Sequence, residues 1–138
     1  MNKAHIGGTR METHHFQVGQ YPHRVEALVV INGADVAVTI GGGSAYHIGA
    51  AAVAVPRPSL ADPNRISASA SVICVTGHKE DELARAAALR LAARFQRVVV
   101  VSAGLHLDDA SPQDIDALTA NFHALVEQVA DMPVTYAQ

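Results

Sequence analysis

Residues 66–106 read ISASASVICVTGHKEDELARAAALRLAARFQRVVVVSAGLH, and this stretch decides the fold. It opens with a Ser/Ala alternation typical of a strand and closes with the run 97–105, in which residues 98–101 are all apolar, as expected for a central strand covered on both faces. Apolar residues recur at helical spacing over residues 79–95. A strand, helix and strand of this length form a right-handed crossover with parallel strands. The two strands therefore end at one rim of the sheet, where His78 and His106 follow them.

The sequence before this stretch predicts strands without helices. Asn32-Gly33 supplies the positive φ values of a tight hairpin turn. Residues 41–47 are expected to form a glycine-rich loop, and Pro56 is expected to end the strand that follows it. The expected strands are 12–20, 25–31, 36–40 and 49–55.

A second helix is predicted after residue 110, with Ser111 as N-cap, Pro112 at the first helical position and Asp114 at the third. The order of elements predicts an α+β fold: one mixed sheet, antiparallel in its N-terminal part, with two helices packed on it. We expect residues 1–11 to be a flexible tail and residues 12–138 to form a single domain.

Composition excludes several classes of protein. With 49% hydrophobic and 17% charged residues among 138, the chain is not disordered. A net charge of −3, no basic block and no Trp argue against nucleic-acid binding. No apolar run is long enough to span a bilayer. Cys74 is the only cysteine and is expected in the core, so no intrachain disulfide forms, which favours the cytoplasm.

The rim carries the strongest chemical signal. His78 and His106 each follow a glycine-bearing turn and precede acidic residues. Imidazole with carboxylate can bind zinc, manganese or iron, or can transfer protons. His47 in the glycine-rich loop is a third candidate for this site, and Asp108 is a further candidate metal ligand. His78 could alternatively decorate the helix start, because no metal-specific spacing is present.

Two further segments could bind an anion. The run 41–44 could direct backbone N–H groups at a phosphate, or be a simple turn. Arg57 stands between two prolines, which would hold its guanidinium for a phosphate or carboxylate. Ser67, Ser69 and Ser71 share one strand face and could contact a ligand or a neighbouring subunit. The small side chains around them would admit a flat ligand or a packed helix.

Taken in order, these segments make the chain resemble the prenylated-flavin chaperone LpdD-like family, which comprises small proteins associated with phenolic-acid or gallate-type decarboxylases. The resemblance runs from about Glu12 to the final helix. It rests on His47-Ile48-Gly49-Ala50, Pro56-Arg57-Pro58-Ser59, Ser67 to Val72, Gly77 to Arg85 and Gly104 to Asp108.

The resemblance implies a fold like that of small proteasome-assembly chaperones, a homodimer, and a role in aromatic acid metabolism. It implies an accessory protein without catalytic residues that binds prenylated FMN, or FMN, and assists its delivery or maturation for a large decarboxylase subunit. We assign phosphate binding to Arg57, and pocket lining or ion binding to His47, His78 and His106. The cofactor-binding residues that we expect are His47, Gly49, Arg57, Ser59, Ser67, Ser69, His78, Lys79 and His106. The alternatives are a metal-dependent enzyme with His78 and His106 as ligands, and a pure protein-assembly factor.

Overall fold

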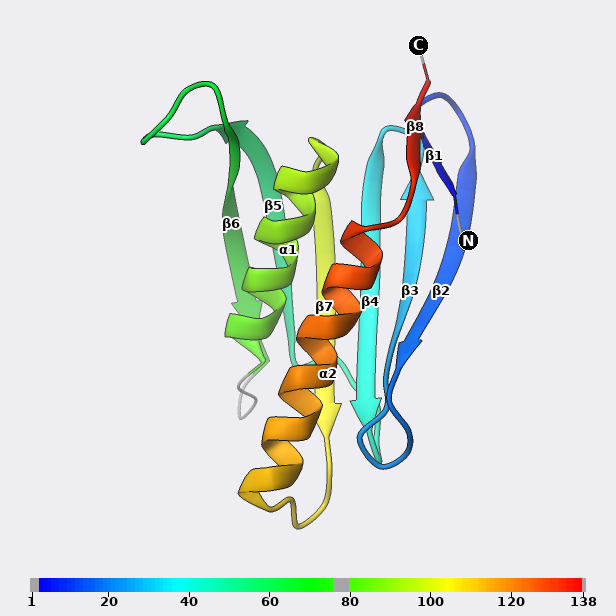
Figure 1. Ribbon diagram of the computed structural model, residues 1–138, viewed down its shortest axis with the longest axis vertical. Helices are drawn as coiled ribbons and strands as arrows, with labels where there is room; N and C mark the ends of the chain where they lie inside the picture. Colours follow the sequence, from blue (N-terminus) through cyan, green and yellow to red (C-terminus); the bar gives the residue numbers. More distant parts are fainter. Residues whose placement is uncertain (1–2, 76–79, 138) are drawn as a thin grey trace.

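The computed structural model describes residues 3–75 and 80–137 and contains eight strands and two helices in these ranges (Figure 1). The elements are β1 (Ala4–Ile6), β2 (Met11–Val18), β3 (Val25–Asn32), β4 (Asp35–Gly43), β5 (Ala50–Pro58), β6 (Ile66–Cys74), α1 (Asp81–Phe95), β7 (Val99–His106), α2 (Pro112–Ala130) and β8 (Val134–Tyr136). Six strands form the main sheet in the order β2-β3-β4-β7-β5-β6, and β1 pairs with β8 in a separate parallel ribbon.

The main sheet is mixed, so the predicted α+β fold with a single mixed sheet and two helices is confirmed. Strands β2, β3 and β4 form an antiparallel meander, and β4 runs parallel to β7. Strand β5 is antiparallel to both of its neighbours, β6 and β7. Hence β6 and β7 are parallel, as predicted, with β5 between them, and both end at one rim of the sheet.

Both helices lie on the same face of this sheet (Figure 1). Helix α1 packs on β5, β6 and β7, and α2 packs on β2 and β3. Strand side chains alternate accordingly: Val25 and Val29 are fully buried under the helices, while Leu28 is 40% exposed on the other face. Among the described residues no helix is long and apolar enough to cross a membrane.

The second face of the sheet is covered by no element that the structure describes. Strand β7 is central in strand order, yet Val100 is 37% exposed. Its all-apolar sequence led us to expect a strand covered on both faces, which is wrong for this chain. The exposed apolar side chains of this uncovered face are Leu28, Val53, Val55, Ile73 and Val100.

The start of α2 matches its sequence signature in detail. The Ser111 side chain accepts a hydrogen bond from the Asp114 N–H at 3.1 Å, and the Asp114 side chain accepts one from the Ser111 N–H at 3.0 Å. Pro112 is the first helical residue. This capping box satisfies donors that a helix N-terminus otherwise leaves open.

Near the N-terminus the structure differs from the flexible tail expected at residues 1–11. Ala4–Ile6 forms β1, and the side chains of Ala4 and Ile6 are fully buried. Three residues are too few to show a periodic pattern, and their partner β8 lies at the other end of the chain.

The prediction that Pro56 ends the strand is wrong. Strand β5 continues to Pro58 and pairs with β6 along its whole length. The prolines are tolerated because β7 pairs with β5 only as far as Ala54, so no strand beyond it needs their missing N–H groups. Cys74, expected in the core, is exposed at the end of the edge strand β6.

Candidate functional site

Two of the predicted site residues, His47 and His106, meet at the rim where β7 ends. Their ring centroids lie 6.3 Å apart, and the rings are nearly perpendicular. His47 precedes β5, and its Nε2 lies 3.0 Å from Glu80 Oε1. His106 is the last residue of β7, and its Nε2 lies 2.7 Å from Asp108 Oδ1. The rim therefore gathers two imidazoles, each beside its own carboxylate.

Glu80 is the buried acid of this rim, with 8% of its surface exposed. It is the N-cap residue of α1, and its Oε1 also accepts a hydrogen bond from the Leu105 N–H at 3.3 Å. Gly49 lies against this carboxylate, because a Cβ there would collide with Glu80 Oε2. Likewise, a Cβ on Gly104 would collide with the His47 carbonyl oxygen. The predicted site residue Gly49 thus makes room for Glu80.

Sequence reasoning did not single out Glu80, although it stands in the run GHKEDE. Three acids in that run look alike, and only the packing of α1 against β5 and β7 separates the buried one from its neighbours. His78 and Lys79 lie outside the described residues, so the expected convergence of His78 with His106 stays a prediction. Among the described residues no group of three or more His, Cys, Asp or Glu side chains could hold a metal ion.

The remaining predicted site residues lie at the other end of β5 and β6. The Arg57 Nε donates to Ser69 Oγ at 2.8 Å, and its Nη1 donates to the Pro58 carbonyl at 3.0 Å. Ser67 pairs with Arg57 across the strands, while Ser59 Oγ accepts the backbone N–H of Ala61. The eight-residue rise from Gly49 to Arg57 corresponds to about 26 Å. One flavin is therefore too short to contact both the rim and the residues around Arg57 in the same chain.

The glycine-rich run proves to be part of a strand rather than a loop or an anion-binding nest. Gly41, Gly42 and Gly43 end β4 and pair with β7. The Gly43 N–H donates to the Arg24 carbonyl and the Ser44 N–H to the His106 carbonyl, so these donors serve the fold. A Cβ on Gly41 would lie 2.7 Å from the Tyr46 ring, so this glycine lets the ring lie on the strand.

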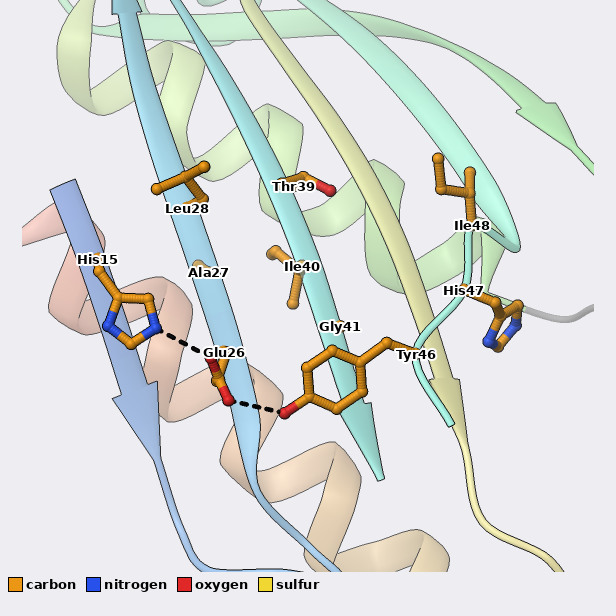
Figure 2. Close-up of a pocket in the computed structure, with 10 residues that line it drawn as sticks. All are labelled: His15, Glu26, Ala27, Leu28, Thr39, Ile40, Gly41, Tyr46, His47 and Ile48. Atoms are coloured by element: carbon orange, nitrogen blue, oxygen red, sulfur yellow. Dashed lines mark hydrogen bonds and ion pairs between the residues drawn. The ribbon is translucent and has the colours of Figure 1, made fainter. Parts of the chain in front are cut away.

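A shallow hollow of about 350 Å³ lies on the uncovered face of the sheet beside this rim (Figure 2). Its floor is formed by β3 and β4, including Leu28, Thr39 and Gly41. Tyr46 and Ile48 stand on one side of it and His15 on the other, as Figure 2 shows. The further lining residues are Glu26, Ala27, Ile40 and His47. His47 thus links the rim to the hollow.

The polar end of the hollow is organised around Glu26. The Tyr46 hydroxyl donates to Glu26 Oε1 at 2.9 Å, and His15 Nε2 lies 2.9 Å from Glu26 Oε2 (Figure 2). The Arg24 Nε lies 3.2 Å from Glu26 Oε1. The hydrogen bond with His15 and then that from Tyr46 lower the pKa of Glu26 below its ordinary value. Glu26 is therefore a carboxylate at neutral pH and acts only as an acceptor.

None of Tyr46, Glu26 and His15 was among the predicted site residues. The alternation of β2 and β3 could have placed His15 and Glu26 on the polar side of each strand. Their meeting with Tyr46 depends on the antiparallel register and on the return of the chain after β4, which sequence periodicity does not specify. Tyr46 in particular gave no signal of its own.

Comparison with protein families gives one match. Residues 19–132 match the family model described as the prenylated flavin chaperone LpdD-like domain. No curated protein matches the chain. The matched range covers the rim and every lining residue of the hollow except His15.

Proposed function

The chain belongs to the prenylated flavin chaperone LpdD-like family, and from this premise we propose that it is a non-catalytic accessory protein that binds prenylated FMN. It assists the delivery or maturation of this cofactor for a phenolic-acid decarboxylase, in aromatic acid metabolism. The observation that carries the proposal is the family match over residues 19–132. The cytoplasm is its proposed place of action, in keeping with a single cysteine.

The rim and the hollow offer chemistry that suits a flavin. A ligand site typically combines an apolar, concave surface with a few convergent polar groups. The hollow has this character, and its volume of about 350 Å³ lies within the range of small-molecule sites. We propose that His47, Gly49 and His106, with His78 and Lys79, border the bound flavin.

Arg57, Ser59, Ser67 and Ser69 lie at the end of β5 and β6 that is far from the rim, so they do not reach the same flavin from the same chain. We propose that this group binds the phosphate of a flavin held by a second copy. The guanidinium suits this role, because it is held in place by Ser69 and still has N–H donors for a phosphate.

We also propose that the chain is a homodimer that pairs through its uncovered sheet face. Val53, Val55 and Val100 expose apolar side chains there, and Ile73 is 77% exposed on the edge strand. Exposed apolar side chains grouped on one face often mark an interaction site. A second copy of the chain would remove it from water.

The proposed delivery role is tested by loading the untagged chain with prenylated FMN under anaerobic conditions and removing free cofactor by gel filtration. The loaded chain is then added to an apo phenolic-acid decarboxylase, and CO₂ release is followed. We expect faster activation than with the same concentration of free prenylated FMN. Equal rates, or a chain that retains no flavin, would count against the proposal; the unloaded chain serves as the blank.

A further inference from the structure

We propose that the hollow on the uncovered sheet face binds the pyrimidine edge of the flavin ring, with Glu26 as the acceptor of the ring's imide N–H and Tyr46 and His15 beside it. This proposal rests on the proposed function and adds the site and the orientation of the ligand. Three other hollows lined by described residues do not combine strand surface with the Glu26, Tyr46 and His15 groups: one lies between the N- and C-terminal segments, and two lie on the helical side of the sheet.

The shape of the hollow's floor suits a planar ring. The floor is strand surface at Thr39, and it is bounded by Leu28, Ile48 and the Tyr46 ring, which covers Gly41 (Figure 2). The Thr39 side chain is small, and its Oγ1 accepts a hydrogen bond from Ser102 Oγ at 2.9 Å. A planar ring can therefore lie on the strands and contact Leu28 and Ile48 at its margins.

The Glu26 carboxylate has unused acceptor capacity. A carboxylate has about four lone-pair sites. Within the described part of the chain, Oε1 faces Tyr46 and Arg24, while Oε2 faces His15. This leaves about one site on Oε2. The Glu26 side chain is 29% exposed, so a ligand can reach it.

The polar end of the hollow matches the pyrimidine edge of a flavin. The pyrimidine edge of an isoalloxazine presents a carbonyl oxygen, the imide N–H and a second carbonyl oxygen, so its order is acceptor, donor, acceptor. The imide N–H can donate to Glu26 Oε2. The Tyr46 hydroxyl hydrogen can turn to one carbonyl, because Arg24 continues to hold Glu26 Oε1. Prenylation adds its ring at the flavin's N5 and C6 and leaves the imide unchanged.

The side chains at the polar end of the hollow already contact one another without a ligand, which lowers the entropic cost of ordering them when a ligand binds. The Tyr46 ring rests on Gly41, and its hydroxyl is held by Glu26.

The test compares FMN with FMN methylated at the imide nitrogen, using flavin fluorescence titration of the full chain, and repeats the titration with prenylated FMN under anaerobic conditions. Methylation removes the donor that faces Glu26 without changing the protein. We expect the wild type to bind the methylated flavin about tenfold more weakly, because a hydrogen bond to a charged group contributes on this scale.

Two variants test the same contact from the protein side. E26Q and Y46F should each weaken FMN binding about tenfold. E26Q should not weaken binding of the methylated flavin much further, because this ligand already lacks the donor that faces Glu26. Y21F is the matched control, since Tyr21 is 66% exposed and outside the hollow. Circular dichroism and thermal melting show whether each variant is folded. If a variant does not fold, titration of the wild type with the methylated flavin still tests the contact with Glu26.

The outcomes separate the two proposals. Saturable binding of FMN and prenylated FMN that neither methylation nor E26Q and Y46F weaken overturns the pyrimidine-edge site and leaves the proposed function standing. No binding of either flavin to the wild type overturns the proposed function and this site with it. Loss of affinity in Y21F equal to that in Y46F also overturns the site.

Discussion

Glu80 shows how a single residue organises the rim without carrying an obvious sequence signal. Its carboxylate accepts the Leu105 N–H and lies beside His47, and Gly49 leaves the space that it occupies. Carboxylates are rarely this buried unless they are paired. Its position therefore ties α1, β7 and the segment before β5 together.

Replacing Glu80 with alanine would leave the partly buried Leu105 N–H without its carboxylate acceptor. We expect E80A to lower the free energy of unfolding by about 1–3 kcal/mol, which is the usual cost of an unsatisfied buried donor. Glu82 is exposed in the first turn of the same helix, so E82A is the control and should change this free energy by less than about 0.5 kcal/mol. Urea denaturation measures both variants, and equal effects would show that Glu80 has no special structural role.

At the level of single residues, the sequence singled out His47 and His106, but it did not reveal why glycines stand beside them. His47 and His106 do meet, and Ser67 and Ser69 do share a face. The glycines of residues 41–43 suggested anion binding, whereas the structure uses Gly41 for the approach of Tyr46. Such contacts join residues across strands, so their spacing along the chain does not reveal them.

Among the elements, helix α2 was predictable because its start is encoded locally. Ser111, Pro112 and Asp114 are neighbours in the sequence, and their hydrogen bonds need no distant partner. The extent of β5 was not predictable in this way. Whether Pro56 ends a strand depends on which side of it carries a neighbour, and the start of β7 decides that.

The capping box predicts how the stability of the fold depends on pH. The Ser111 backbone N–H, and then His23, lower the pKa of Asp114 below its ordinary 3.8. A carboxyl with a lowered pKa in the folded state stabilises the fold above its unfolded pKa and loses this contribution as pH falls through the folded pKa.

We therefore expect the free energy of unfolding to fall less steeply in D114N than in the wild type on acidification below about pH 4. Urea denaturation across this pH range measures both slopes. Asp116 is exposed on the same helix, so D116N should follow the wild type. A D114N curve parallel to that of the wild type would be the contrary result.

The rim lies at one end of strand β5 and Arg57 at the other. The proposed binding of the flavin phosphate by Arg57 can therefore be tested separately from the rim. We expect R57A to weaken FMN about tenfold and to leave riboflavin, which lacks the phosphate, unchanged. Arg85 is exposed on α1 and gives the control R85A. Fluorescence titration with both flavins decides the matter. If both flavins are affected equally or neither is, the phosphate is bound elsewhere.

At the scale of the whole molecule, the fold class followed from the order of elements, but the uncovered face did not. The all-apolar run of β7 suggested cover on both sides, and only the placement of both helices on one face shows otherwise (Figure 1). Sequence patterns report that a side chain avoids water. They do not say whether its cover comes from the same chain or from another.

The proposed homodimer makes a prediction about this face. Val55 is 51% exposed there, and V55E would place a charge between the two sheets. In analytical ultracentrifugation we expect the wild type to have twice the 14.5 kDa mass of one chain, and V55E to have the mass of a monomer. Ala86 is exposed on α1, so A86E should remain a dimer. A monomeric wild type at micromolar concentration would contradict pairing through this face.

A crystal structure of the chain with prenylated FMN tests most directly whether the uncovered sheet face is the cofactor site. The flavin ring is expected to lie over Thr39 and beside the Tyr46 ring, with its imide nitrogen at hydrogen-bond distance from Glu26. A flavin bound between the two helices, with the hollow beside Tyr46 left open, would contradict this placement.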